Sequence, residues 1–285
     1  MKPSTTTHSD VFVPQRFKHL VARHIIKNNW KTGPSSALIL GIHGPSGEGK
    51  TFQCNELFKE IGVTAVRIAA RELESEEAGK PSKLVSAKYC EASDLLNDKR
   101  SHLSVLFMND LDAGIGTWGA DVQYTVNTQL VVATLMDIAD FPTHVNGEET
   151  HRIPIIVTGN DFTKLYEPLT RAGRMDTYTW TPTFLEKVDI VRRSLFPMPS
   201  LTDDEIAGLV FAFRKMPVSF FSLVKGRLHD AYIDSLIRER GIAEVLKYVT
   251  EPNSAQYVPN YTFEVLFTIA TAVASDKLIN HLRRR

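Results

Sequence analysis

Residues 44–51, Gly-Pro-Ser-Gly-Glu-Gly-Lys-Thr, meet every fixed position of the phosphate-binding loop pattern G-x-x-x-x-G-K-[ST]. The apolar segment 38–43 precedes this loop, and a helical pattern over 51–61 follows it. A strand, a loop and a helix in this order cradle phosphate, because backbone N–H groups and the helix N-terminus point into the loop. The feature therefore constrains the chain to a parallel α/β fold with a site for a nucleoside triphosphate.

Two side chains of this loop carry specific chemistry. We expect the Lys50 ammonium to reach the β- and γ-phosphates and the Thr51 hydroxyl to ligate magnesium. The alternative is a glycine-rich turn without a ligand, which the flanking strand and helix disfavour. We predict ATP and Mg²⁺ as cofactors, with nucleotide contacts from Gly44, Pro45, Ser46, Gly47, Glu48, Gly49, Lys50, Thr51 and Phe52.

Apolar strands alternate with helical patterns over the first two thirds of the chain, which indicates a parallel sheet with helices on both faces. The predicted strands are 38–43, 63–69, 103–108, 153–158 and 177–181, and the predicted helices between them are 51–61, 81–97 and 124–139. After Phe196 the patterns are helical only, over 201–213, 220–240, 242–248 and 263–284. We predict three parts: an N-terminal helix and linker (1–36), an α/β nucleotide-binding subdomain (37–196) and an all-α lid subdomain (197–285).

Composition excludes several other classes of protein. The 33 basic residues balance 33 acidic ones, which argues against a nucleic-acid partner. Cys54 and Cys90, the two cysteines, provide neither a disulfide framework nor a zinc ligand set. Apolar runs stay short of the roughly 18–20 residues that a membrane helix needs, and residues 1–10 lack a secretory or transit signal. We therefore expect a cytoplasmic protein without a membrane partner.

Acidic residues follow the apolar strand that ends at Met108. We expect Asp110 to polarise the attacking water or to hold the metal, and Asp112, two residues on, to share these roles together with Asn109. The alternative is a capping or solvated acidic turn. Asn160 similarly ends the strand 153–158, where it can hydrogen-bond the γ-phosphate or the lytic water, unless it only closes a turn.

Arginines supply the remaining candidate groups. Arg171 and Arg174 flank a glycine and are expected at a subunit edge, where they would stabilise developing phosphate charge on a neighbour, unless they form surface salt bridges. Arg227, in the helical third, would reach back to the nucleotide and couple its state to the lid. Lys225 is an alternative for that role, and a solvated helix face is the other interpretation.

The phosphate loop, the acidic segment, Asn160, the arginine pair and Arg227, in this order, resemble an AAA+ ATPase. The amino-acid sequences of particular segments resemble the Rubisco activases, a family in which Asn-Asp at the positions of 109–110 is usual. The segments that carry this resemblance are 38–44, 71–75, 78–79, 107–114, 123–127, 133–140, 154–162 and 171–175.

The resemblance implies a hexameric ring that uses ATP hydrolysis to loosen Rubisco, with its large subunit as client, and so to release trapped sugar phosphates. It implies the cyanobacterial type, without a small-subunit-like C-terminal domain, in the cytoplasm or the carboxysome. Loops that face the ring's pore would hold the client, through Ala78, Gly79 and Lys80 in one loop and the aromatic Trp118 and Tyr124 in or near the other. Trp118 can also pack locally within its glycine-rich loop.

Two other functions remain open at this stage. An AAA+ ATPase of the same construction could remodel a different protein client, since the resemblance does not include the family's Rubisco-recruiting domain. A small-molecule P-loop kinase is the other possibility, and the arginine pair and the helical C-terminal third argue against it.

Overall fold

The computed structural model describes residues 11–30, 36–75, 77–116, 126–250 and 261–282. Contacts between Cα atoms divide the chain into two compact units. The first spans Val13–Thr181, and the second spans Pro182–Arg285 together with the short segment that ends at Phe12.

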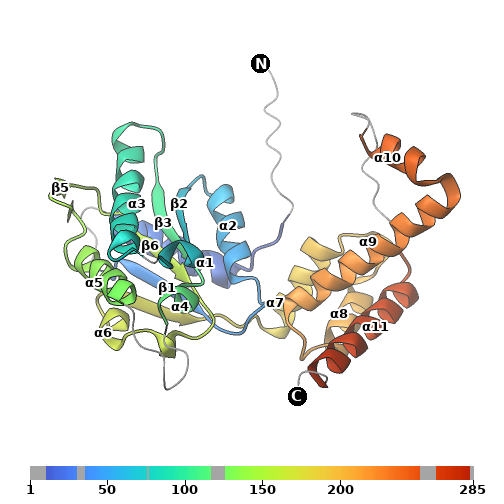
Figure 1. Ribbon diagram of the computed structural model, residues 1–285. Helices are drawn as coiled ribbons and strands as arrows, with labels where there is room; N and C mark the ends of the chain where they lie inside the picture. The colour runs from blue at the N-terminus through green and yellow to red at the C-terminus, as the bar shows by residue number, and fades with distance from the viewer. Residues whose placement is uncertain (1–10, 31–35, 76, 117–125, 251–260, 283–285) are drawn as a thin grey trace. The chain divides into compact units, whose positions relative to one another are not determined.

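A five-stranded parallel sheet forms the centre of the first unit, in the order β2-β3-β6-β1-β7 (Figure 1). Its three central strands are buried along almost their whole length, because a parallel sheet is covered on both faces, whereas the two edge strands expose polar residues. This order places β1 between β6 and β7, so the carboxyl ends of β1, β3 and β6 meet along one edge of the sheet. The strands are β1 Ile39–His43, β2 Thr64–Ala69, β3 Ser104–Asn109, β6 Ile155–Thr158 and β7 Met175–Thr179.

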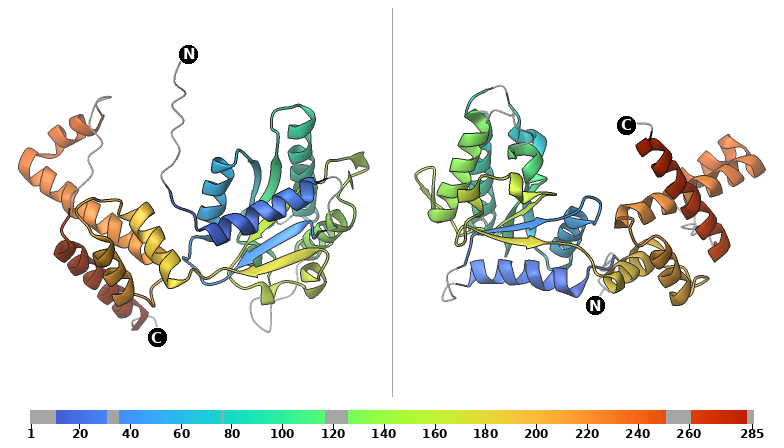
Figure 2. Two further views of the ribbon diagram at one scale, coloured as in Figure 1. Left: turned by 180° about the vertical axis from the view of Figure 1, so that it is seen from behind. Right: turned by 90° about the horizontal axis from the view of Figure 1, so that it is seen from below.

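Alternate residues of each strand enter two different apolar clusters, one on each face of the sheet. Leu40, Val105 and Ile156 pack beneath α1 (Gln15–Asn29) and α2 (Lys50–Glu60), and Figure 2 shows α1 lying across that face. Their strand neighbours pack beneath α3 (Lys80–Asn97) and α5 (Val126–Asp140) on the opposite face. The shorter elements are η1 Ala70–Leu73, α4 Leu111–Ile115, β4 His144–Val145, β5 Glu148–Glu149, η2 Phe162–Lys164 and α6 Glu167–Thr170.

Helices make up the second unit, and their apolar faces share one cluster that includes Val191, Phe196, Phe220 and Leu266. The elements are α7 Phe184–Ile190, the π-turn η3 Val191–Leu195, α8 Asp203–Ala212, α9 Val218–Arg240, α10 Ile242–Thr250 and α11 Phe263–Leu282. The described residues of this unit contain no strand.

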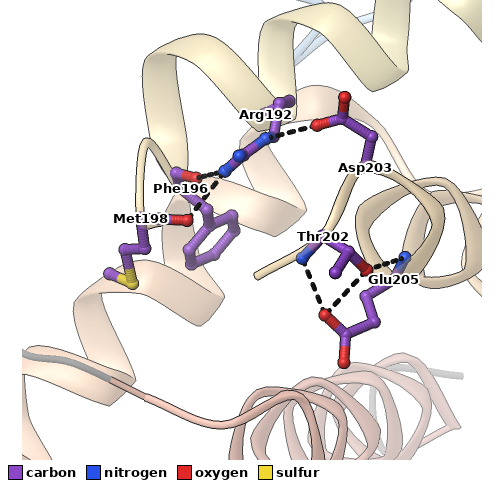
Figure 3. Close-up of polar contacts among 6 residues, drawn as sticks. All are labelled: Arg192, Phe196, Met198, Thr202, Asp203 and Glu205. Carbon is purple, nitrogen blue, oxygen red and sulfur yellow. Dashed lines mark hydrogen bonds and ion pairs between the residues drawn. The ribbon is translucent and has the colours of Figure 1, made fainter. Parts of the chain in front are cut away.

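Side chains fix the connection between η3 and α8, as Figure 3 shows. Arg192 donates to the carbonyls of Phe196 (3.1 Å) and Met198 (2.9 Å) and pairs with Asp203 (2.8 Å). Thr202 and Glu205 form a reciprocal capping box at the start of α8, an arrangement that stabilises a helix by about 1 kcal/mol. The connection is therefore held by bonds at both of its ends.

The predicted α/β core followed by a helical part is confirmed, and the strands and helices lie within a few residues of their predicted bounds. The pattern analysis missed α7, the one-turn helices and the β4–β5 hairpin, which are too short to show a period. The units divide at Thr181, earlier than the predicted boundary at 196, because Val191 and Phe196 pack with the helical cluster. No described helix is both long and apolar enough to cross a membrane.

Candidate active site

The phosphate-binding loop lies between β1 and α2, and glycines permit its backbone path. Gly49, with φ of 76°, is the residue immediately before α2, and Gly44, with φ of 138°, opens the loop. A Cβ on Gly44 would overlap the carbonyl oxygen of Trp180. The buried Trp180 indole donates to the carbonyl of Glu48 (3.1 Å), so the loop is supported from behind. Pro45 and Ser46 of the loop and Phe52 in the first turn of α2 are exposed.

The Lys50 ammonium occupies the interior of this loop. It donates to the carbonyls of Gly44 (2.8 Å) and Pro45 (2.9 Å) and to Oδ1 of Asn160 (3.2 Å). Burial lowers the pKa of Lys50, and the nearby carboxylates of Asp110, Asp112 and Glu48 oppose that shift. Because loop carbonyls surround a buried cation here, the residues fit a ligand whose phosphate oxygens would replace those carbonyls.

A network of hydroxyl, amide and carboxylate groups connects α2 to the ends of β3 and β6. Asn109 Oδ1 accepts from the hydroxyls of Thr51 and Thr158, the latter at 2.9 Å, and Asn109 Nδ2 donates to Asp110 (2.9 Å). Asp110 adopts a left-handed backbone conformation, with φ of 52°, which is uncommon for a residue other than glycine. Strained conformations of this kind concentrate at functional sites.

The same oxygens suit magnesium, which keeps several waters and takes few protein ligands when it is bound with phosphates. The Thr51 hydroxyl donates to Asn109 Oδ1, and the Asp110 carboxylate accepts from Asn109 Nδ2, so one amide links both groups. Within the described residues, no group of three or more His, Cys, Asp or Glu side chains forms a metal cage. The donor set thus fits a metal held together with phosphates, and the role of Thr51 and Asp110 as its ligands stays a prediction. The sequence did not predict that Thr158 joins this network, although a hydroxyl residue at the buried end of an apolar strand could have indicated it.

Asp112 differs from Asp110 although both follow β3. Its side chain is fully buried, and Oδ2 accepts the backbone N–H groups of Asn160 (2.9 Å) and Asp161 (2.8 Å). The carboxylate is therefore turned toward the loop after β6. The Asn160 side chain is exposed and lies on Lys50, as a group that contacts phosphate should.

The two arginines have different surroundings. Arg174 makes a bidentate ion pair with Asp140 on α5 (2.9 and 2.5 Å) and donates to the carbonyl of Pro168 (3.0 Å). The hydrogen bonds from Arg174 lower the pKa of Asp140 and raise that of Arg174 itself. Arg171 is exposed, and its guanidinium makes no ion pair with the residues that the structure describes. Sequence analysis missed Asp140 because it lies 34 positions before its partner.

The two residues of the helical unit that were predicted to contact the nucleotide, Lys225 and Arg227, lie on α9. Arg227 is exposed on this helix and lies 3.7 Å from Asp230, as expected for a solvated ion pair one turn apart. Lys225 is half-buried, and burial lowers its pKa. Both belong to the second unit, so their contact with the nucleotide stays a prediction.

One of the two predicted client loops is described. Gly79 has φ of 80°, and Asn127 on α5 accepts its N–H (2.8 Å) while donating to the carbonyl of Ser75 (2.6 Å). This fixes the ends of the turn and leaves the side chains of Ala78 and Lys80 exposed. Trp118 and Tyr124, the predicted aromatic residues, lie outside the described residues.

Two family descriptions match the chain, one for each unit. Residues 40–183 match the family described as "ATPase family associated with various cellular activities (AAA)". Residues 185–277 match the one described as "Ribulose bisphosphate carboxylase/oxygenase activase, AAA, helical". The border between the matches agrees with the division of the structure at Thr181.

Several relatives bear the name ribulose bisphosphate carboxylase/oxygenase activase. One from Nostoc sp. is 42% identical over 94% of this chain and 65% of its own length. One from Anabaena sp. is 41% identical over 93% of this chain and 66% of its own length, and a chloroplastic one from Zea mays is 40% identical over 88% and 58%. The chain thus spans less than two thirds of the length of these relatives. It belongs to the AAA family of ATPases and carries the helical domain described for ribulose bisphosphate carboxylase/oxygenase activases.

Proposed function

We propose that this chain hydrolyses ATP and uses the energy to remodel Rubisco, releasing inhibitory sugar phosphates from its active site. The observation that carries the ATPase proposal is the convergence of Lys50, Asp110 and Asn160 at one edge of the sheet. The names of the relatives support Rubisco as the client.

Lys50 and the loop around it would bind the β- and γ-phosphates. The ammonium already has three acceptors in a fixed arrangement, and phosphate oxygens would replace the carbonyls of Gly44 and Pro45. Asn160 Oδ1 would keep the ammonium in place from the far side. Such preorganised charge stabilises a transition state in phosphoryl transfer, because few groups must reorient during the reaction.

Thr51 and Asp110 would hold magnesium, which supplies charge neutralisation on the phosphates when it is bound. Asn109 orients both groups, since its amide oxygen accepts from Thr51 and its amide nitrogen donates to Asp110. Asp110 would also polarise the attacking water. Arg227, from the helical unit, would contact the nucleotide and couple its state to the lid.

Arg171 would act on the nucleotide of a neighbouring copy in a ring, which we propose to be hexameric. Its exposure on the loop before β7 supports this role, because a guanidinium without an ion pair to the described residues of its own chain is available to a partner. Arg174 would instead hold this loop in place through Asp140 and Pro168. In this proposal hydrolysis depends on assembly.

The client would be held by the loop of Ala78, Gly79 and Lys80, together with Trp118 and Tyr124 around the pore of the ring. Asn127 fixes the backbone of the first loop while its outward side chains stay exposed, which suits a brief contact with a protein client. We place the protein in the cyanobacterial cytoplasm or carboxysome, in line with the Nostoc and Anabaena relatives.

A reactivation assay tests the proposal. Rubisco blocked with ribulose bisphosphate is incubated with the protein, ATP and magnesium, and carboxylation is followed over time. We expect recovery that requires hydrolysable ATP and that the Lys50→Ala variant cannot support. ATP turnover without recovery of any cognate Rubisco would leave a remodelling ATPase with a different protein client.

A further inference from the structure

Asp112 lies two residues beyond the proposed catalytic carboxylate of Asp110 but has a different environment. Its side chain is 0% exposed. One of its oxygens, Oδ2, accepts two backbone N–H groups, those of Asn160 at 2.9 Å and Asp161 at 2.8 Å. Hydrogen bonds from N–H groups to a buried carboxylate are short and about twice as strong as neutral ones. The carboxylate therefore fixes the backbone of the loop after β6.

The approach of Asp112 to this loop depends on Gly159. A Cβ on Gly159 would overlap Oδ1 of Asp112, so no larger residue fits at this position without moving the carboxylate. The same loop is tied to the P-loop strand, because Gly159 donates to the carbonyl of Ile42 (3.1 Å) and the Asn160 carbonyl accepts from Gly44 (3.2 Å). Asp112 connects the same loop to the segment that follows β3.

We propose that Asp112 is a positioning residue for Asn160. It holds the backbone from which the Asn160 side chain reaches Lys50, and it links that loop rigidly to the segment that carries Asp110. Two of the groups proposed to surround the γ-phosphate, Asp110 and Asn160, are thereby kept at a fixed separation. The inference rests on the proposed ATPase function and assigns Asp112 a different role from the metal or water chemistry predicted from the sequence.

A pair of substitutions separates the two roles. Asp112→Asn keeps an oxygen that can accept both N–H groups, whereas Asp112→Ala removes it. A positioning role predicts that kcat falls about 100-fold in the alanine variant, whereas the asparagine variant keeps most of the parent activity. The KM for ATP should change little in either variant. A role as metal ligand or base predicts that both variants are equally inactive and that both need more magnesium. That second pattern would overturn the proposal.

The hydrogen-exchange rates of the Asn160 and Asp161 amides measure how firmly Asp112 holds this backbone, and the measurement does not require ATP hydrolysis. We expect these amides to exchange at least about tenfold faster in Asp112→Ala than in the parent protein, and close to the parent rate in Asp112→Asn. Equal exchange in all three proteins would also overturn the proposal. If the alanine variant does not fold, Asp112→Glu replaces it, because the longer side chain cannot keep the same two bonds in the space beside Gly159.

Asp176→Asn is the matched control, since it removes an exposed carboxylate from β7 in the same unit. We expect this control to leave both kcat and amide exchange unchanged. A parent protein that hydrolyses no ATP would refute the proposed function, while the exchange data would still decide whether Asp112 holds the loop after β6.

Discussion

The region around Lys50 and the region around Arg171 place their positive charges in opposite ways. Lys50 is buried and donates to three acceptors of its own chain. Arg171 is exposed, and the ion pair in its loop belongs to Arg174 instead. In the proposed function, the groups around Lys50 bind phosphate within one chain, whereas Arg171 would act on the nucleotide of a second copy. The contrast therefore motivates experiments that test whether the site is shared between subunits.

Removal of the Lys50 side chain should cause the largest loss of ATP hydrolysis. Lys50→Ala deletes the only side-chain cation that lies inside the phosphate loop among the described residues. We expect hydrolysis to fall by about 1,000-fold, because a preorganised charge on the transferred phosphate is lost. Steady-state ATPase assays measure this, and Lys59→Ala on the exposed side of the same helix serves as control. Turnover near the parent rate would contradict the assignment of the loop.

Removal of Arg171 should have the next largest effect, and the loss should be reversible by mixing. We expect Arg171→Ala to reduce hydrolysis by about 100-fold while ATP still binds, since the loop around Lys50 is unchanged. A mixture of Lys50→Ala and Arg171→Ala proteins should regain activity, because about one quarter of randomly paired interfaces combine the intact group from each copy.

The mixing experiment decides between a shared and a self-contained site. Each variant alone keeps only a small residual activity in this prediction, so turnover above the sum of the two must come from interfaces between unlike subunits. Activity is measured at several ratios of the two proteins and at several total concentrations. A mixture that stays as inactive as its components would mean that Arg171 acts within its own chain or not on the nucleotide.

Substitution of Asp140 should have a smaller effect that sharpens the contrast within the arginine pair. Asp140→Asn removes the bidentate partner of Arg174 and should loosen the loop that presents Arg171. We expect hydrolysis to fall by about tenfold with little change in ATP affinity, because a misplaced group acts mainly on the chemical step. Asp137→Asn, an exposed residue on the same helix, should have no effect. An equal loss in both variants would point to α5 rather than to the ion pair.

The sequence predicted which residues of the first region lie together, because local patterns encode their positions. The glycines and Lys50 are consecutive, and Asp110 and Asn160 each end an apolar strand, so strand order alone brings them together. The orientation of Asp112 could not be predicted in the same way. Whether a carboxylate three residues past a strand faces the phosphate or the next loop depends on the backbone turn at Asp110, where φ is positive.

The second region and the domain boundary depended on distant contacts, and the sequence predicted them less completely. Arg171 and Arg174 were equivalent by pattern, and Asp140, which separates their roles, is contributed by a helix far earlier in the chain. The boundary at Thr181 likewise depends on Val191 and Phe196 packing with helices that follow them. Tertiary packing, which a periodicity does not report, determines both features.

The last prediction concerns stability rather than activity, and it rests on a histidine of α1. His24 on this helix is buried, burial lowers its pKa to about 4, and the positive charges of Arg152 and Lys27 act in the same direction, against hydrogen bonding to the carbonyls of Ile155 and Leu38. The folded protein therefore keeps His24 neutral at pH values where the unfolded chain, with a histidine pKa near 6.5, takes up a proton.

This sets the sign of a pH effect on stability. The contribution of His24 is complete above about pH 6.5 and is lost as the pH falls toward 4, because only the unfolded state gains the proton in that window. Between pH 7.5 and pH 5 the free energy of unfolding should fall by about 2 kcal/mol from this residue alone. Urea titrations at both pH values measure the fall, with His24→Gln expected to lose most of the pH dependence and His19→Gln, on the same helix, to keep it. An unchanged pH dependence in His24→Gln would assign the acid sensitivity to other groups.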